Sequence, residues 1–301
     1  MKNQSSIFCR LLLVSLMAFL FVQPIFSQED EESGKDLRPV RNLFDGIWLI
    51  DNQTALVPIK GTFEFDILHR FGLWKNGFED LFGLYASSNI RLGFNYIPID
   101  RLQIGFGLTK TNITWDFNAK YALIQQARSG GSPVAVTYFV NTAVDTRDKA
   151  IGKFANGTDR YSYFHQLMIA RKFSDNLSLQ VAGSLSHFNA VEAYLTENNE
   201  EKGKLKNDHI ALALSGKYKV GAWVNLIANV DIPITSHNLE SVDPASNISF
   251  GVELTSSSHQ FQIFCGNFYN ITQQRNNVYN QNSFGDGDIL IGFNITRLWN
   301  F

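Results

Sequence analysis

The chain has 301 residues, of which 45% are hydrophobic, 13% are aromatic and only 18% are charged. This apolar content is too high for an intrinsically disordered protein, and the formal net charge of −2 offers no electrostatic attraction for nucleic acid. Nucleic acid is therefore excluded as an expected partner.

The first 27 residues have the layout of a secretory signal peptide. Lys2 and Arg10 supply positive charge, and a largely apolar run at 11–22 precedes the small residue Ser27. A helix of about twelve residues rises only about 18 Å, too short for the about 30 Å hydrocarbon core of a bilayer. We therefore predict a signal peptide at 1–27, and a retained signal anchor is the alternative.

Two short segments precede the main domain at 61–301. Residues 28–41 begin with an acidic run and have no apolar period, which predicts a disordered linker. Residues 42–60 are predicted to form an N-terminal hairpin or plug segment at the periplasmic mouth. Loss of the signal peptide leaves Cys265 as the single cysteine, so we expect no intrachain disulfide.

Alternation of apolar and polar residues dominates the main domain. Leu212 and Leu214 share one face of a stretch whose other face carries Ala213 and Ser215. A period of two is typical of strands with one apolar and one polar face. Twelve such stretches occur, at 62–71, 89–97, 101–110, 112–124, 133–144, 160–173, 176–188, 209–220, 223–233, 247–256, 259–268 and 288–301. A count of fourteen strands is the alternative.

The connections between these stretches alternate in length. Tight turns are predicted at 98–100, 129–132, 174–175, 221–222 and 256–258, and longer connections at 72–88, 145–159, 189–208, 234–246 and 269–287. Each stretch is close to the 9–11 residues that a tilted strand needs to cross a bilayer. We therefore predict an all-β fold, a transmembrane antiparallel up-and-down β-barrel in the outer membrane with short periplasmic turns and long extracellular loops. A water-soluble barrel or sandwich is the alternative.

The last stretch alternates up to the final residue, Phe301. It is similar to the terminal strand of Gram-negative outer-membrane proteins, which typically ends in an aromatic residue read by the assembly machinery. Trp299 and Phe301 are therefore the predicted assembly signal, which outer-membrane fractionation of a chain lacking Phe301 would test. Outer-membrane lipid and the barrel assembly machinery are the expected partners.

Several short segments carry a family resemblance. They lie at 49–53, 60–65, 69–72, 78–84, 88–93 and 100–107. Together they resemble the opening of a bacterial β-barrel family catalogued as domain of unknown function 5777. The resemblance covers roughly residues 40–301 and implies an outer-membrane barrel of a Gram-negative bacterium. It implies no substrate.

The polar face of the strands supplies the candidate site. Ten charged residues are expected by alternation to line the lumen: Glu64, Asp66, Arg91, Asp116, Lys120, Lys172, Lys217, Lys219, Asp231 and Glu253. Five of each sign predict either an ion-pair network that fills a narrow barrel or a polar, weakly selective pore. Loop 73–85 is predicted either to fold inward as a constriction or to rest on the rim.

Motifs for catalysis were not found. The chain contains no His-Glu-x-x-His, no Gly-x-Ser-x-Gly and no phosphate-binding loop. We therefore assign no catalytic, cofactor-binding or metal-binding residues and expect no cofactor. The leading hypothesis is a non-enzymatic barrel that offers a passage or binding surface to small polar solutes of unknown identity.

Two other classes of function stay open. One is an outer-membrane enzyme that uses rim or loop residues such as Asp80, His165 and Glu192. The other is a structural or adhesive barrel that works through loops 189–208 and 269–287.

Overall fold

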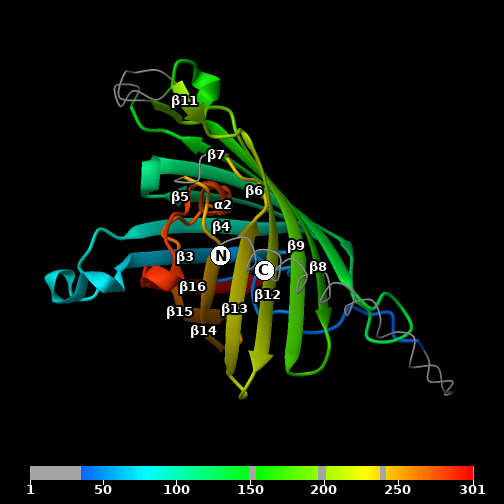
Figure 1. The fold of residues 1–301 in the computed structure, drawn as a ribbon. Helices are drawn as coiled ribbons and strands as arrows, with labels where there is room; N and C mark the ends of the chain where they lie inside the picture. Colours follow the sequence, from blue (N-terminus) through cyan, green and yellow to red (C-terminus); the bar gives the residue numbers. More distant parts are fainter. Residues whose placement is uncertain (1–34, 149–153, 196–200, 238–241, 301) are drawn as a thin grey trace.

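The computed structural model describes residues 35–148, 154–195, 201–237 and 242–300. Twelve strands in this part of the chain form one closed antiparallel barrel (Figure 1). The strands are β3 (Thr62–Leu73), β4 (Asn89–Ile99), β5 (Leu102–Thr109), β6 (Thr114–Ile124), β7 (Ala135–Asp145), β8 (Tyr161–Lys172), β9 (Leu177–Phe188), β12 (Asp208–Lys219), β13 (Val224–Pro233), β14 (Asn247–Thr255), β15 (His259–Gly266) and β16 (Leu290–Asn300). The predicted all-β barrel and its twelve strands are confirmed.

The barrel closes between its first and last strands. β16 pairs with β3 from Asn300 opposite Thr62 to Leu290 opposite Leu73, and every other strand pairs with its neighbours along the chain. Closure satisfies the backbone hydrogen bonds of every strand without leaving a sheet edge.

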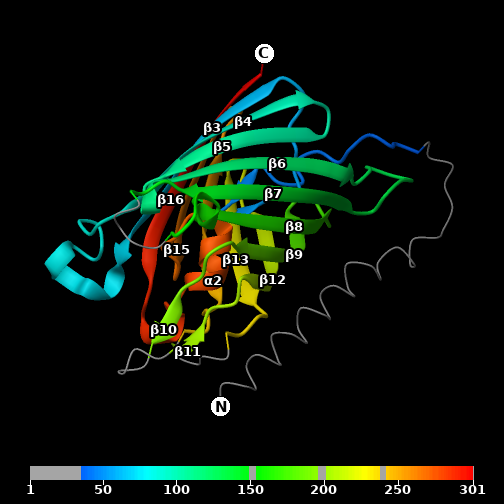
Figure 2. The ribbon, with the colours of Figure 1, turned by 90° about the horizontal axis from the view of Figure 1, so that it is seen from above.

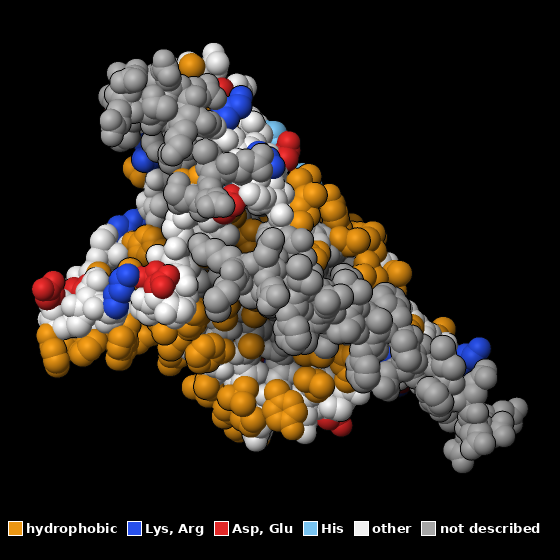
Figure 3. Space-filling view, viewed as in Figure 1, with side chains coloured by type: hydrophobic (Ala, Val, Ile, Leu, Met, Phe, Trp, Pro, Cys, Tyr) orange, Lys and Arg blue, Asp and Glu red, His pale blue; other side chains and the backbone are white. Residues whose placement is uncertain are grey.

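The strands bury one face and expose the other. In β12, Ala211, Ala213 and Ser215 are buried, whereas Leu212 and Leu214 between them are partly exposed. Large apolar side chains cover the outer wall (Figure 3). An apolar exterior around a polar interior is the facing of a membrane barrel and the reverse of a soluble one.

The two ends of the barrel differ. One end, here called the short-turn end, carries the connections between β4 and β5, β6 and β7, β8 and β9, β12 and β13, and β14 and β15, which are tight except for residues 125–134 between β6 and β7. The other, the long-loop end, carries η2 (Trp74–Asp80), η3 (Thr111–Ile113), η5 (Gly157–Arg160), β10 (Ala193–Leu195), β11 (Glu201–Lys204), α2 (Gln273–Tyr279) and η6 (Phe284–Asp286). No helix in the described ranges is long and apolar enough to span a bilayer.

The loop at 73–85 lies outside the lumen. It projects away from the long-loop end (cyan in Figures 1 and 2), and its Phe78 and Tyr85 are 85% and 81% exposed. The loop therefore does not fold inward as a constriction, and of the two predicted arrangements the one outside the lumen is observed.

The N-terminal segment enters the lumen from the short-turn end. Residues 42–60, here called the plug segment, contain a small hairpin of β1 (Trp48–Leu49) and β2 (Asn52–Gln53). The buried residues of the plug segment include Leu43, Phe44, Ile47, Trp48, Leu49, Ile50, Asp51, Asn52, Gln53, Thr54 and Ala55. Its apolar members pack against wall residues of β7, β8, β9, β12, β13 and β15.

Residues 35–41 lie beside the connection between β6 and β7. Pro39 forms a β-bridge with Ala127, and the amide of Val40 donates to the carbonyl of Gln126 over 2.8 Å. The predicted signal peptide at 1–27 and the first half of the predicted linker at 28–41 lie outside the described residues.

Helix α2 enters the lumen from the long-loop end. Figure 2 looks onto the barrel and shows α2 within the ring of strands. Five of its seven residues are buried: Gln273, Gln274, Asn276, Asn277 and Val278. The lumen is thus occupied from both ends.

The outward facing of the apolar side chains makes a prediction about stability. Ile263 lies midway along β15 and is 60% exposed, so Ile263→Arg is expected to cost about 2–4 kcal/mol of unfolding free energy in a bilayer. Val220, just beyond the end of β12, provides the control, because Val220→Arg near the interface should cost about 0–1 kcal/mol. Urea unfolding in lipid vesicles measures both values. Equal costs at the two positions would contradict the membrane placement.

Candidate functional site

A buried ion-pair cluster joins β3, β4 and β6, and it reaches across β5, which lies between β4 and β6. Arg91 of β4 donates from Nη1 to Asp66 of β3 over 2.8 Å. Its Nε and Nη2 donate to the two carboxylate oxygens of Asp116 on β6, each over 2.9 Å. All three side chains are at least 98% buried. One guanidinium therefore neutralises two carboxylates in the lumen wall.

Two glycines make room for this guanidinium. A Cβ atom at Gly93 would lie 2.3 Å from Nη1 of Arg91, and one at Gly107 would lie 2.2 Å from Nη2. The glycines of the Gly105-Phe106-Gly107 stretch thus belong to a strand, where close approach of a neighbouring side chain requires glycine.

The plug segment docks on this cluster and beside it. The indole of Trp48 donates to Asp66 over 3.3 Å, and its ring centroid lies 5.3 Å from Cζ of Arg91. Further along, the Lys120 ammonium donates to Oε1 of Gln53 over 3.0 Å and to the carbonyl of Thr54 over 3.2 Å. Arg91 and Lys120 therefore both contact the plug segment.

The opposite wall binds the hairpin through amides. The side chain of Asn52 donates to Oδ1 of Asn229 over 3.0 Å and to both oxygens of Asp231 over 2.9 and 3.0 Å. Gln180 accepts from the amide of Ala55 over 2.7 Å and donates to the carbonyl of Gln53 over 2.8 Å. Wall side chains thus bind the backbone of the plug segment directly.

The turn of the hairpin is bound in the same way. The amide of Ile50 donates to Gln262 over 3.0 Å, and its carbonyl accepts from Asn294 over 2.7 Å. Arg70 reaches the same carbonyl over 3.3 Å. Alternation places Arg70 on the polar face, yet it was not among the ten predicted lumen residues, although it is fully buried.

A further ion pair lies at the short-turn mouth. Lys217 donates to Asp45 of the plug segment over 2.9 Å, and Asn225 donates to the same Oδ2 over 2.8 Å. Asn225 also donates to Glu253 over 2.8 Å. The ion pair between Lys217 and Asp45 therefore binds the first residues of the plug segment to the wall at the short-turn end.

The ten predicted lumen residues fall into two groups. Eight are buried: Glu64, Asp66, Arg91, Asp116, Lys120, Lys217, Asp231 and Glu253. Lys172 is partly buried at the short-turn mouth, where it donates to the carbonyl of Arg41 over 3.1 Å, and Lys219 at the end of β12 is exposed. The role of these residues toward a solute stays a prediction.

Helix α2 and the plug segment meet inside the barrel. The side-chain amide of Asn276 donates from Nδ2 to Oδ2 of Asp51, at the hairpin turn, over 3.4 Å. The neighbouring Gln274 reaches the wall and donates to Asn141 over 3.0 Å. This contact joins the two elements that enter the lumen from opposite ends.

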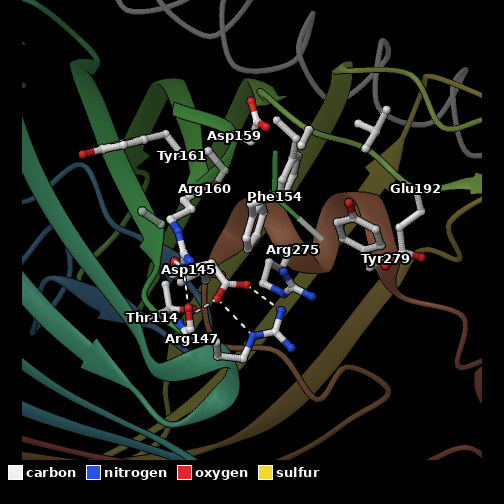
Figure 4. Close-up of a pocket in the computed structure, with 16 residues that line it drawn as sticks. Thr114, Asp145, Arg147, Phe154, Asp159, Arg160, Tyr161, Glu192, Arg275 and Tyr279 are labelled. Atoms are coloured by element: carbon white, nitrogen blue, oxygen red, sulfur yellow. Dashed lines mark hydrogen bonds and ion pairs between the residues drawn. The ribbon is translucent and has the colours of Figure 1, made fainter. Parts of the chain in front are cut away.

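Cavities lie on both sides of this junction. The cavity at the long-loop end has a volume of about 400 Å³ and is bordered by α2 and the ends of β6, β7, β8 and β9 (Figure 4). Two cavities of about 540 and 760 Å³ flank the plug segment at the short-turn end. The second of these is lined by Asp45, Lys172, Lys217 and Lys219.

The residues of the enzyme alternative lie apart. His165 lies on the outer face of β8, where its Nδ1 is 2.8 Å from the Tyr138 hydroxyl, whereas Glu192 borders the cavity at the long-loop end. Asp80 belongs to η2, outside the lumen. Within the described ranges, no group of three or more His, Cys, Asp or Glu residues could hold a metal ion.

The predicted assembly signal is described in part. The Trp299 ring packs against Phe63 of β3, with ring centroids 5.6 Å apart, and under the guanidinium of Arg297. Phe301 lies outside the described residues, so the assembly signal stays a prediction.

Comparison with known proteins finds a family profile and several solved structures that are similar to this chain. A profile described as membrane bound beta barrel domain (DUF5777) matches residues 44–299, and no curated protein gives a significant match. Among solved structures, the NanC porin is similar at 7% identity and a TM-score of 0.47, over 79% of this chain and 99% of that one. An outer membrane channel from Pseudomonas putida F1 is similar at 10% identity and a TM-score of 0.47, over 81% and 97%. The KdgM porin is similar at 10% identity and a TM-score of 0.41, over 79% and 99%.

Proposed function

The chain belongs to the DUF5777 family of membrane-bound β-barrel domains, and from this premise we propose that it is a gated passage for small polar solutes. The family resemblance predicted from the sequence is confirmed, and the membrane barrel agrees with the predicted outer-membrane location. In this proposal the plug segment is the gate, and a solute passes when the plug segment leaves the lumen.

One observation carries the proposal: polar wall side chains bind the plug segment. Its backbone at Trp48, Ile50, Gln53, Thr54 and Ala55 is hydrogen-bonded to side chains of the wall. These amide, hydroxyl and ammonium groups can exchange the plug segment for water at little cost per bond, because a protein hydrogen bond is worth only about 0.5–1.5 kcal/mol net.

A barrel that stayed filled would not need such a wall. Replacing buried ion pairs by well-packed apolar side chains is often neutral or stabilising, so a permanent interior gains little stability from Arg91, Asp66 and Asp116. A polar wall is compatible with both states of a gate, packed on the plug segment or lined by water.

Solute uptake by liposomes tests the gate. We expect the full chain to admit a small sugar slowly, and a chain whose residues 42–58 are replaced by a Gly/Ser linker of about six residues to admit it rapidly. The control shortens loop 74–85, which lies outside the lumen and should leave uptake unchanged. A heat-modifiable folded band verifies insertion of each variant.

The same assay can reject the proposal. If folded, inserted barrels without the plug segment still exclude the sugar, the lumen is not a passage. A closed structural or adhesive barrel would then be the better account.

A further inference from the structure

The cavity at the long-loop end contains a guanidinium with unused donors. Arg275, on α2, borders this cavity beside Asp145, Phe154 and Tyr279 (Figure 4). Its side chain has no hydrogen bond in the part of the chain that the structure describes, and its Nε is buried. Burial lowers the pKa of Arg275 below its ordinary value, although a guanidinium stays charged at neutral pH. Arg275 as a whole is partly buried, and a charge that is partly removed from water without a hydrogen-bonding partner favours an anion.

The other two arginines of the cavity are already bound. Arg147 forms a bidentate pair with Asp145, at 3.0 Å from Nε and 2.6 Å from Nη2. Arg160 donates to the backbone carbonyls of Asp145 and Arg147 over 2.8 and 2.5 Å. Arg275, by contrast, donates no side-chain hydrogen bond to the described residues, so its donors are left for a ligand.

Three acids border the cavity, and hydrogen bonds already engage two of them. Both carboxylate oxygens of Asp145 accept from Arg147, and Asp159 accepts from the backbone amide of Asn156 at the start of η5 over 2.8 Å. Glu192, the third acid of the lining, is exposed. The charges of Asp145 and Glu192 attract that of Arg275, but Arg275 donates no side-chain hydrogen bond to the described residues, so its donors can bind an anion.

Aromatic side chains also line this cavity. Phe188 packs edge-to-face on Tyr279 with ring centroids 5.2 Å apart, and the Tyr279 ring lies 5.0 Å from Cζ of Arg275. Phe154 faces the cavity beneath Arg160. A ligand with an apolar or aromatic body would bury its surface against these rings.

We propose that this cavity binds a small monocarboxylate with an apolar or aromatic body. The carboxylate accepts two hydrogen bonds from Arg275, whose planar guanidinium matches it, and the body packs on Phe188 and Tyr279. A volume of about 400 Å³ lies within the range of small-molecule sites. The inference rests on the proposed passage, since it assigns a solute class to its long-loop entrance.

Calorimetric titration of the refolded full chain with phenylacetate tests this assignment. We expect saturable binding, at least tenfold weaker binding to Arg275→Gln, and partial recovery in Arg275→Lys, which restores charge without the bidentate geometry. Arg128→Gln, at the short-turn end, is the matched control and should bind as the unaltered chain does. Phenethylamine, a cation with a similar body, should not bind.

Two results would overturn the inference. One is equal binding of phenylacetate to Arg275→Gln and the unaltered chain, both folded by heat modifiability. The other is no binding of phenylacetate to the unaltered chain. If sugar uptake still rises when the plug segment is removed, the proposed passage is retained, and only the assignment of a monocarboxylate as its solute is rejected.

Discussion

Arg91→Met is expected to lower the free energy of unfolding by about 3–5 kcal/mol. The substitution keeps a long side chain in the space over Gly93 and Gly107 but removes the charge that pairs Asp66 and Asp116. Both carboxylates are then buried without a cation, which is the most costly way to break a buried ion pair. Urea unfolding in lipid vesicles measures the loss.

The matched control also removes the two carboxylate charges that Arg91→Met leaves without a cation. In Arg91→Met/Asp66→Asn/Asp116→Asn the cluster is neutral, so most of the lost stability should return. If Arg91→Met were as stable as the unaltered chain, the ion-pair cluster would not stabilise the barrel. A triple variant as unstable as the single one would show that packing, not charge, sets the cost.

Lys217→Glu is expected to raise the open probability of single channels about tenfold. The substitution places a second carboxylate opposite Asp45, where the structure has an ion pair of 2.9 Å, and so repels the base of the plug segment. Asp45 is about one-fifth exposed, so we discount the interaction to about 1.4 kcal/mol, which corresponds to a factor of ten. Single-channel recording in planar bilayers measures the open probability.

Exchanging the charges of Asp45 and Lys217 shows whether the open probability depends on their pairing or on the net charge at this end of the lumen. Asp45→Lys alone should open the channel as Lys217→Glu does, and the double variant Asp45→Lys/Lys217→Glu should close it again. Lys219→Glu, on the same strand but exposed, should leave the open probability unchanged. A double variant as open as either single one would mean that this pair does not hold the plug segment.

The strands could be predicted because their signal is local. Alternation placed one strand at 176–188, and β9 runs from Leu177 to Phe188; the other eleven agree similarly. Lipid outside and polar groups inside impose a period of two along each strand. The same period placed Asp66, Arg91 and Asp116 on one face, although it could not pair them.

The contacts inside the lumen could not be predicted in the same way. The plug segment has no regular period, and Asn52 contacts Asp231, 179 positions away in the chain. Helix α2 has seven residues, about two turns, too few for a helical pattern to stand out. The unused donors of Arg275 depend on where its neighbours fold, which residue types alone do not reveal.

A reversible tether measures most directly whether the plug segment is the gate. In Asp45→Cys/Lys217→Cys, with Cys265→Ser to remove the native thiol, a short bifunctional thiol reagent would fix the plug segment to β12 through reducible bonds. Single-channel recording should find the tethered barrel silent and should detect openings after a reductant releases it, because the released variant lacks the ion pair. Equal currents before and after reduction would contradict the account.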